Sequence, residues 1–128
     1  MDTSGGAHPM TDQQWRAISP AEAAVIVAIL SGSNVAGCSG MAVNIDRAQV
    51  SAETGWILDI SNPHNDISTD IPDGPFPGRA FVPNSADYRG EVILWMKDGK
   101  ICGLEYAWIT DEPPTRWPHP EEIQIVDQ

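Results

Sequence analysis

The sequence predicts a small α+β domain, in which one buried N-terminal helix packs on a mainly antiparallel sheet with a central β-hairpin over residues 91–109. Two local patterns lead to this class. Residues 23–30 form an apolar run of helical character, and two runs rich in β-branched and aromatic residues flank the Asp98-Gly99 pair. A chain of 128 residues with 41% hydrophobic residues is long enough to bury one core. We therefore expect a single domain.

The first element that we expect is a helix that begins at Ser19. Residues 1–10 are small and polar, so we expect a disordered leader there and a single domain over residues 11–128. Ser19 suits the N-cap, the next residue is proline, and Glu22 stands three positions after the cap. Because residues 23–30 are apolar on every side, we expect a largely buried helix.

Two strands and a long loop should follow the helix. Alternating apolar residues predict a strand over residues 41–45, and residues 55–60 predict a second strand that pairs with it. Residues 61–78 are mostly Asn, Asp, Pro, Ser and Gly, and loops of this length are commonly functional. A short strand is expected at residues 79–82.

The hairpin is the strongest local prediction. A two-residue type I′ turn needs positive φ at both central residues, which Asp98-Gly99 tolerates. The strands then cover about 91–97 and 100–109, and a regular ladder places Trp95 opposite Cys102. Both faces of the hairpin are substantially apolar, so we expect the helix on one face and loops or a partner chain on the other.

Prolines define the last part of the chain. Pro113, Pro114, Pro118 and Pro120 cannot donate to a ladder, so we expect an extended segment over the surface. Residues 122–126 then predict an edge strand.

Charge and cysteine content limit the classes of partner and compartment. The net charge of −11 repels nucleic-acid phosphates and anionic lipid, so we expect no nucleic-acid partner and no membrane. The N-terminus lacks a basic region before an apolar stretch, which argues against a standard secretory signal. Cys38 and Cys102 are widely spaced, which fits free thiols in a reducing cytoplasm better than a disulfide framework, although one bridge stays open. We expect a cytoplasmic protein.

Residues for catalysis or metal binding do not form a recognisable motif. The loop contains four acids that could gather ligands for a hard cation such as calcium, with His64 beside them: Asp59, Asp66, Asp70 and Asp73. Their spacing lacks the alternate ligands and the final Glu of a calcium loop, so a solvated acidic loop is the better interpretation. Glu105 is a carboxylate within an apolar strand, which is one mark of a general acid or base, but it has no evident catalytic partner. We expect no cofactor and no metal, and an enzyme is the less favoured class.

Acidic and aromatic residues instead favour protein binding. No Lys or Arg lies between Arg47 and Arg79, which concentrates negative potential on the 61–78 loop. Aromatic residues also flank the Asp111-Glu112 step, and interfaces favour such anchors beside carboxylates that accept from a partner's arginine. The candidate partner-binding residues are Asp66, Asp70, Asp73, Tyr106, Asp111, Glu112 and Trp117.

Two segments of the C-terminal half resemble small acidic uncharacterised proteins of actinobacteria. These segments are GRAFVPN at residues 78–84 and GLEYAWITDEPP at residues 103–114. Proteins of that kind look like immunity proteins, so the resemblance implies a small, single-domain, cytoplasmic inhibitor of a toxin. It transfers no functional residue to this chain.

We therefore expect a protein-binding inhibitor that neutralises a basic toxin or enzyme domain through an acidic and aromatic surface. One alternative is a small-molecule-binding domain or small enzyme, with a pocket between the sheet and the 61–78 loop and with Glu105 and His64 as polar contributors. A second alternative is a homodimer that uses the second apolar face of the hairpin.

Overall fold

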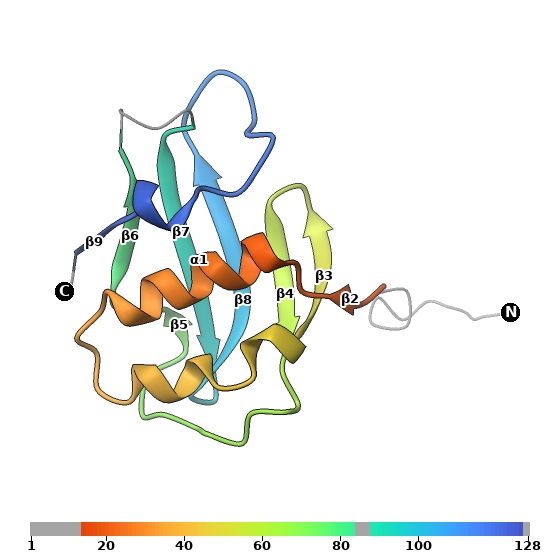
Figure 1. Cartoon of the computed structure of the whole chain (residues 1–128), viewed down its shortest axis with the longest axis vertical. Helices are drawn as coiled ribbons and strands as arrows, with labels where there is room; N and C mark the ends of the chain where they lie inside the picture. Colours follow the sequence, from red (N-terminus) through yellow and green to blue (C-terminus); the bar gives the residue numbers. More distant parts are fainter. Residues whose placement is uncertain (1–13, 84–87, 127–128) are drawn as a thin grey trace, which may run out of the picture.

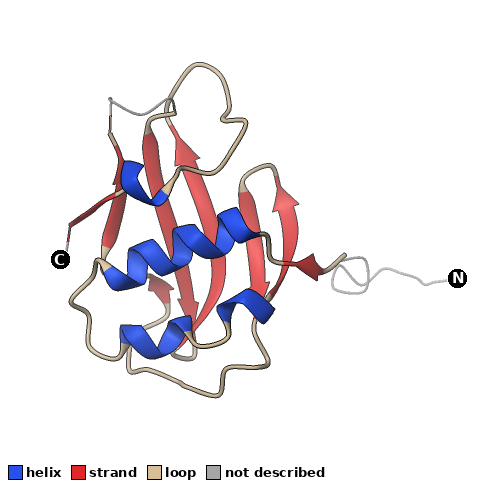
Figure 2. Cartoon of the chain, in the orientation of Figure 1, coloured by secondary structure: helices blue, strands red, loops and turns tan. Residues whose placement is uncertain are grey.

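One α-helix lies across one face of an antiparallel sheet in the computed structural model of this chain, which describes residues 14–83 and 88–126 (Figures 1 and 2). The predicted α+β class is confirmed. Within this part of the chain the sheet has eight strands in the order β2-β3-β4-β8-β7-β6-β9, with β5 paired to β7. The strands are β2 (Arg16–Ala17), β3 (Gln49–Thr54), β4 (Ile57–Ser61), β5 (Gly74–Pro75), β6 (Arg79–Val82), β7 (Gly90–Lys97), β8 (Lys100–Trp108) and β9 (Gln124–Val126). The expected leader over residues 1–10 lies outside the described residues.

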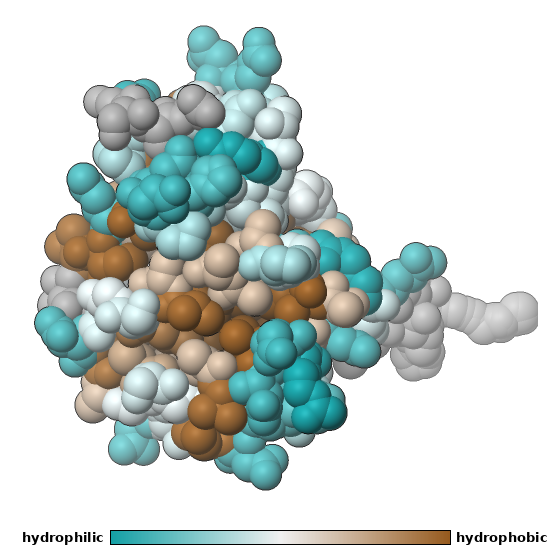
Figure 3. Space-filling view, in the orientation of Figure 1, coloured by the Kyte–Doolittle hydropathy of each residue, from teal (hydrophilic) through white to brown (hydrophobic). Residues whose placement is uncertain are grey.

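Helix α1 (Pro20–Ser31) begins as predicted. The Ser19 hydroxyl accepts from the Glu22 backbone N–H at 3.1 Å, and the Glu22 carboxylate accepts from the Ser19 backbone N–H at 2.8 Å, which completes a capping box. One side of the helix is buried, whereas Val27 on the other side is 41% exposed. Figure 3 shows an apolar band across this side of the molecule. Among the described residues, no helix is both long and apolar enough to cross a bilayer.

The prediction of a strand over residues 41–45 is wrong. This segment contains the 3₁₀ helices η2 (Cys38–Ala42) and η3 (Ile45–Arg47), each preceded by a residue with left-handed backbone. Met41 and Ile45 are buried while Val43 is 44% exposed, so the core contacts repeat every four residues rather than every two. The strand β4 pairs with β3 instead. The polar sequence of β3, QVSAET, gave no signal for a strand.

The hairpin forms with a register that differs from the predicted one. Asp98 and Gly99 have φ of 55° and 75°, as the type I′ turn requires. Trp95 lies opposite Gly103, not opposite Cys102, because Cys102 is the extra residue of a β-bulge. On the side of the bulge that lies away from the turn, Leu94 pairs with Leu104, and both side chains lie in the core. The expected strand at 79–82 and the edge strand near the C-terminus are confirmed as β6 and β9.

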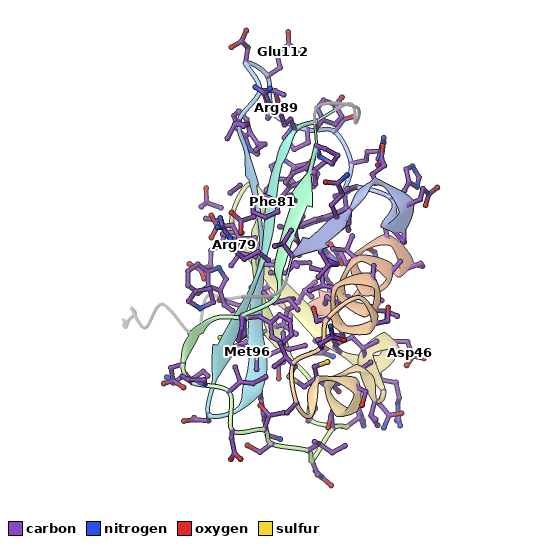
Figure 4. The ribbon with its side chains drawn as sticks, turned by 90° about the vertical axis from the view of Figure 1, so that its left-hand side faces the viewer. Asp46, Arg79, Phe81, Arg89, Met96 and Glu112 are labelled. Atoms are coloured by element: carbon purple, nitrogen blue, oxygen red, sulfur yellow. The ribbon has the colours of Figure 1, made fainter. Side chains whose placement is uncertain are left out.

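The two faces of the sheet differ in what covers them. The described helices α1, η2, η3 and η4 (Pro120–Glu122) all lie on one side of the sheet (Figure 4). The core lies between them and the sheet, where Val92, Leu94 and Leu104 are at most 2% exposed. On the opposite side, within the described residues, no helix covers the strands. We call this side the open face.

Candidate protein-binding face

The open face consists of alternate residues on β3, β4, β6, β7 and β8. Two rows of residues cross it perpendicular to the strands. In one row Glu105 lies between Ile93 and Ile57, and in the next row Gly103 lies between Trp95 and Asp59. The sheet register therefore places apolar and acidic side chains next to each other.

Trp95 is at the centre of this face and is held in one orientation. Its half-buried indole N–H donates to a Glu105 carboxylate oxygen at 3.1 Å. Gly103 opposite it has no side chain, and a Cβ there would lie 3.5 Å from the Trp95 Cδ1 atom. The indole therefore packs directly against β8 at this position.

Three carboxylates lie beside Trp95. A hydrogen bond with Asp59, followed by the negative charges of Asp59 and Glu105, raises the pKa of Glu53. Burial raises the pKa of the Cys102 thiol, and the charge of Asp59 raises it further while Lys97 opposes that effect. Like charges in such proximity attract a cationic group from outside the chain.

Two hollows adjoin Trp95, one on each side. The first has a volume of about 300 Å³ and is lined by the carboxylates of Glu53, Asp59 and Glu105 together with Ile57 and Trp95. We call it the acidic hollow.

The second hollow has a volume of about 350 Å³ and differs in chemistry. It is bounded by the Pro75 to Arg79 segment and by Glu91, Ile93 and Trp95. The Arg79 guanidinium donates to both Glu91 carboxylate oxygens, at 3.0 and 2.9 Å, and lies 4.7 Å from the Phe81 ring centroid. Because this ion pair balances its own charge, the remaining lining is apolar, and we call it the apolar hollow. Figure 4 shows Arg79 on the side away from Asp46 and α1.

The predicted loop acids lie at one end of the sheet, beside the hairpin turn. Asp66 and Asp70 are exposed, and Asp73 accepts from the Asp98 backbone N–H at 2.9 Å. Thr69 also donates from its backbone N–H and its hydroxyl to the Gly99 carbonyl oxygen, at 3.0 and 2.9 Å. This part of the loop is therefore tied to the hairpin turn.

The other predicted residues lie elsewhere. Asp111 and Glu112 are exposed in the loop that follows β8, at the opposite end of the sheet from the hairpin turn (Figures 1 and 4). Tyr106 and Trp117 are only 3% and 9% exposed. Their rings stack at 5.8 Å, and Trp56 meets Trp117 edge-on at 5.1 Å. The structure thus separates the two acidic groups and places both aromatic candidates in the core, where they attach the C-terminal segment to the sheet.

The 61–78 loop borders hollows of different size. The one lined by Met41, Ile45, Asn65 and Lys100 among others has a volume of about 40 Å³, which is room for water rather than for a metabolite. The apolar hollow, which lies between residues 75–78 of this loop and β7, measures about 350 Å³, within the roughly 300–1,000 Å³ of ligand pockets. A ligand pocket between the sheet and this loop therefore stays a prediction, but its two expected polar contributors do not meet, since Glu105 lies on the open face and the His64 carbonyl accepts from Asn44 beside η3.

Sequence reasoning missed Trp95, Glu53 and Asp59 as protein-binding candidates, although it weighed Asp59 as a cation ligand. The signal that was available is the alternation in β7, where Glu91, Ile93 and Trp95 share one face. Their neighbours on β8 could not be assigned, because the bulge at Cys102 shifts the ladder by one residue.

Among the residues that the structure describes, no group of three His, Cys, Asp or Glu side chains is placed to hold a metal ion. Both cysteines are free. A scan against protein-family models and searches of the curated proteins and of the solved structures found no match to this chain.

Proposed function

We propose that this chain is a cytoplasmic protein-binding inhibitor of the immunity type, which neutralises a basic toxin or enzyme domain by docking its open face on it. One observation supports this function above the others. Trp95 is half-buried at the centre of a sheet face that no described helix covers, with Glu53, Asp59 and Glu105 beside it. Tryptophan is enriched among the residues that dominate binding energy, and carboxylates accept strong hydrogen bonds from arginine.

Inhibition would follow from occlusion. The net charge of −11 attracts a basic partner over long range and raises the rate of encounter. After docking, burial of Trp95 against the partner excludes water and slows dissociation. Four acids lie away from the open face: Asp66, Asp70, Asp111 and Glu112. They contribute to the long-range electrostatic attraction and do not contact the partner.

The test uses three variants of the tagged full chain. Trp95→Ala removes the anchor, Asp59→Lys with Glu105→Lys reverses the charge beside it, and Val27→Ser is the matched control on the helix side, where Val27 is also exposed. Each variant is first checked for wild-type circular dichroism. The bait is then incubated with lysate of the source organism, and captured proteins are quantified by mass spectrometry and assayed for inhibition.

The proposal expects one basic protein that wild type and Val27→Ser capture and inhibit. Trp95→Ala should lose it mainly through faster dissociation, and the charge reversal mainly through slower association. Capture that does not depend on Trp95, or a captured enzyme whose activity is unchanged, would show that the open face is not an inhibitory surface.

A further inference from the structure

The acidic hollow has the features of a receptor for one cationic side chain. Its three carboxylates come from three neighbouring strands, β3, β4 and β8, and Trp95 from the next strand, β7, lines the hollow with them. Trp95 supplies an aromatic wall, and a guanidinium or ammonium group over an indole face gains a cation–π attraction in addition to hydrogen bonds. The Ile57 side chain adds an apolar part to the lining, against which the aliphatic stem of an arginine or lysine can pack.

The apolar hollow has the opposite preference. Pro75, Phe76, Pro77 and Ile93 provide its apolar lining. The charges at its rim are already paired, since Arg79 and Glu91 form a bidentate ion pair. A second cation would compete with Arg79 for Glu91, whereas an aliphatic or aromatic side chain gains burial against Trp95 and Ile93.

We propose that the two hollows are adjoining subsites for one extended segment of the partner, which places an arginine or lysine in the acidic hollow and an apolar side chain in the apolar hollow. This inference rests on the proposed function and specifies the chemistry of the partner. The acidic hollow lies over β8 and β4, and the apolar hollow lies between β7 and the Pro75 to Arg79 segment, with Trp95 as their common wall.

The sheet geometry fixes the spacing of the two side chains. Neighbouring strands are about 4.8 Å apart, so hollows two strands apart are separated by roughly 10 Å. An extended chain advances about 3.3 Å per residue and only its alternate side chains face the same side, so the cation and the apolar side chain should be two or four positions apart. The segment must cross the strands of the open face rather than pair with an edge strand.

A peptide selection tests this recognition pattern directly. A library of random displayed peptides is selected on the wild-type protein and depleted on Trp95→Ala. The expected result is enrichment of peptides that carry Arg or Lys and, two or four positions away, a large apolar residue. The cation of the best peptide is then replaced by glutamine, and separately its apolar residue is replaced by alanine.

Paired substitutions assign each side chain to its hollow. Loss of the cation should weaken binding to wild type about tenfold or more, and binding to the Asp59→Asn, Glu105→Gln variant by less than about twofold. Loss of the apolar residue should weaken binding to that same variant as much as to wild type, which is the internal control.

Two outcomes would overturn the inference. Trp95-dependent peptides without the paired cation and apolar residue would do so while leaving the proposed function in place. A selection without any Trp95-dependent peptide would also overturn it, and the capture experiment above then decides the proposed function independently.

Discussion

At the scale of single residues, Tyr106 shows how burial determines the role of an aromatic side chain. Its hydroxyl donates to the Tyr88 carbonyl oxygen, and its ring contacts the rings of both Trp56 and Trp117. Burial, with the nearby charge of Glu122, raises the pKa of Tyr106 to about 12. Tyr106 therefore stabilises the attachment of the C-terminal segment, and its side chain is shielded from solvent.

Replacing Tyr106 by phenylalanine should lower the free energy of unfolding by about 1–2 kcal/mol, because the Tyr88 carbonyl loses its donor inside the protein. Urea unfolding monitored by tryptophan fluorescence measures the loss. The control is Tyr88→Phe, since the Tyr88 hydroxyl pairs with Thr115 at an exposed position and its removal should cost less. Equal losses in the two variants would contradict the buried role of Tyr106.

Glu122 should give a pH-dependent contribution to stability. Hydrogen bonds from Arg116, at 2.8 and 3.1 Å, and from the His119 backbone N–H lower the pKa of Glu122 to about 2. Since the folded-state pKa lies below the ordinary value of 4.5, the stabilisation is present above about pH 4.5 and is lost as the pH falls towards 2.

Glu122→Gln should therefore reduce stability at pH 7 and have a much smaller effect at pH 2. The pair is partly exposed, so we expect a loss of only about 0.5–1 kcal/mol at neutral pH. Thermal unfolding of wild type and variant over this pH range measures the difference, with the exposed neighbour substitution Glu121→Gln as control. A difference that persists undiminished at pH 2 would show that the effect is not ionic.

At the scale of elements, the hairpin turn and the long loop form one structural unit. Gly99 has φ of 75°, and a Cβ on it would lie 2.8 Å from the Thr69 backbone nitrogen and 2.6 Å from the Ser68 hydroxyl oxygen. The same turn is bound through the Asp98 carbonyl, which accepts from Ser68 at 2.8 Å. Close approach as well as backbone conformation thus requires glycine at this position.

Gly99→Ala should destabilise the protein by more than the about 1–2 kcal/mol that positive φ alone costs, because the loop must also move. Gly55→Ala is the matched control, since Gly55 has φ of 47° but no atom within 4 Å of an added Cβ. Hydrogen exchange at the Thr69 amide should accelerate only in the Gly99 variant. If both variants lose the same stability and Thr69 stays protected, the loop is not held by the turn.

The elements that the sequence predicted correctly are those with local signals. The capping box at Ser19 and the Asp98-Gly99 turn each fix the backbone through residues a few positions apart, and α1 and the hairpin follow from them. The elements that it mispredicted depend on distant contacts. The segment over 41–45 alternates like a strand but folds as 3₁₀ helices, because its buried residues contact α1 rather than a neighbouring strand.

The candidate site was less predictable than the fold. Whether Trp95 faces the core or the open face depends on which residues it meets on β8, and the bulge at Cys102 is set by tertiary pairing. Asp59 and Glu53 come together only through the β3–β4 register, and β3 had no recognisable pattern. The acidic character of the chain was evident from composition, but the place where it meets an aromatic side chain was not.

At the scale of the whole molecule, repulsion among 18 acidic residues is opposed by only seven Lys and Arg. Within the described part of the chain, ion pairs join Arg16 to Glu22, Arg79 to Glu91 and Arg116 to Glu122. The excess of like charge destabilises the compact state by self-repulsion. The strongly negative electrostatic potential of the protein therefore lowers its free energy of unfolding.

Added salt should stabilise the protein. Raising the ionic strength from about 0.01 M to about 0.15 M shortens the Debye length from about 30 to 8 Å, which screens the long-range repulsion more than the close ion pairs. Differential scanning calorimetry should show a higher melting temperature at the higher salt concentration. The slope should be smaller for Asp111→Asn with Glu112→Gln, whose acids are exposed and far from the ion pairs. A melting temperature that falls with salt would mean that the ion pairs dominate.

The apolar surface of α1 has a consequence for synthesis of the chain. Helix α1 leaves the ribosome before any strand that buries it, and its cover on β7 and β8 is complete only at Trp108. At roughly 5–20 residues per second the helical segment waits on the order of ten seconds for that cover. An isolated helix of 12 residues is marginal in water, so the nascent segment is an unfolded apolar stretch. During translation it is therefore a natural substrate for the chaperones that bind emerging chains.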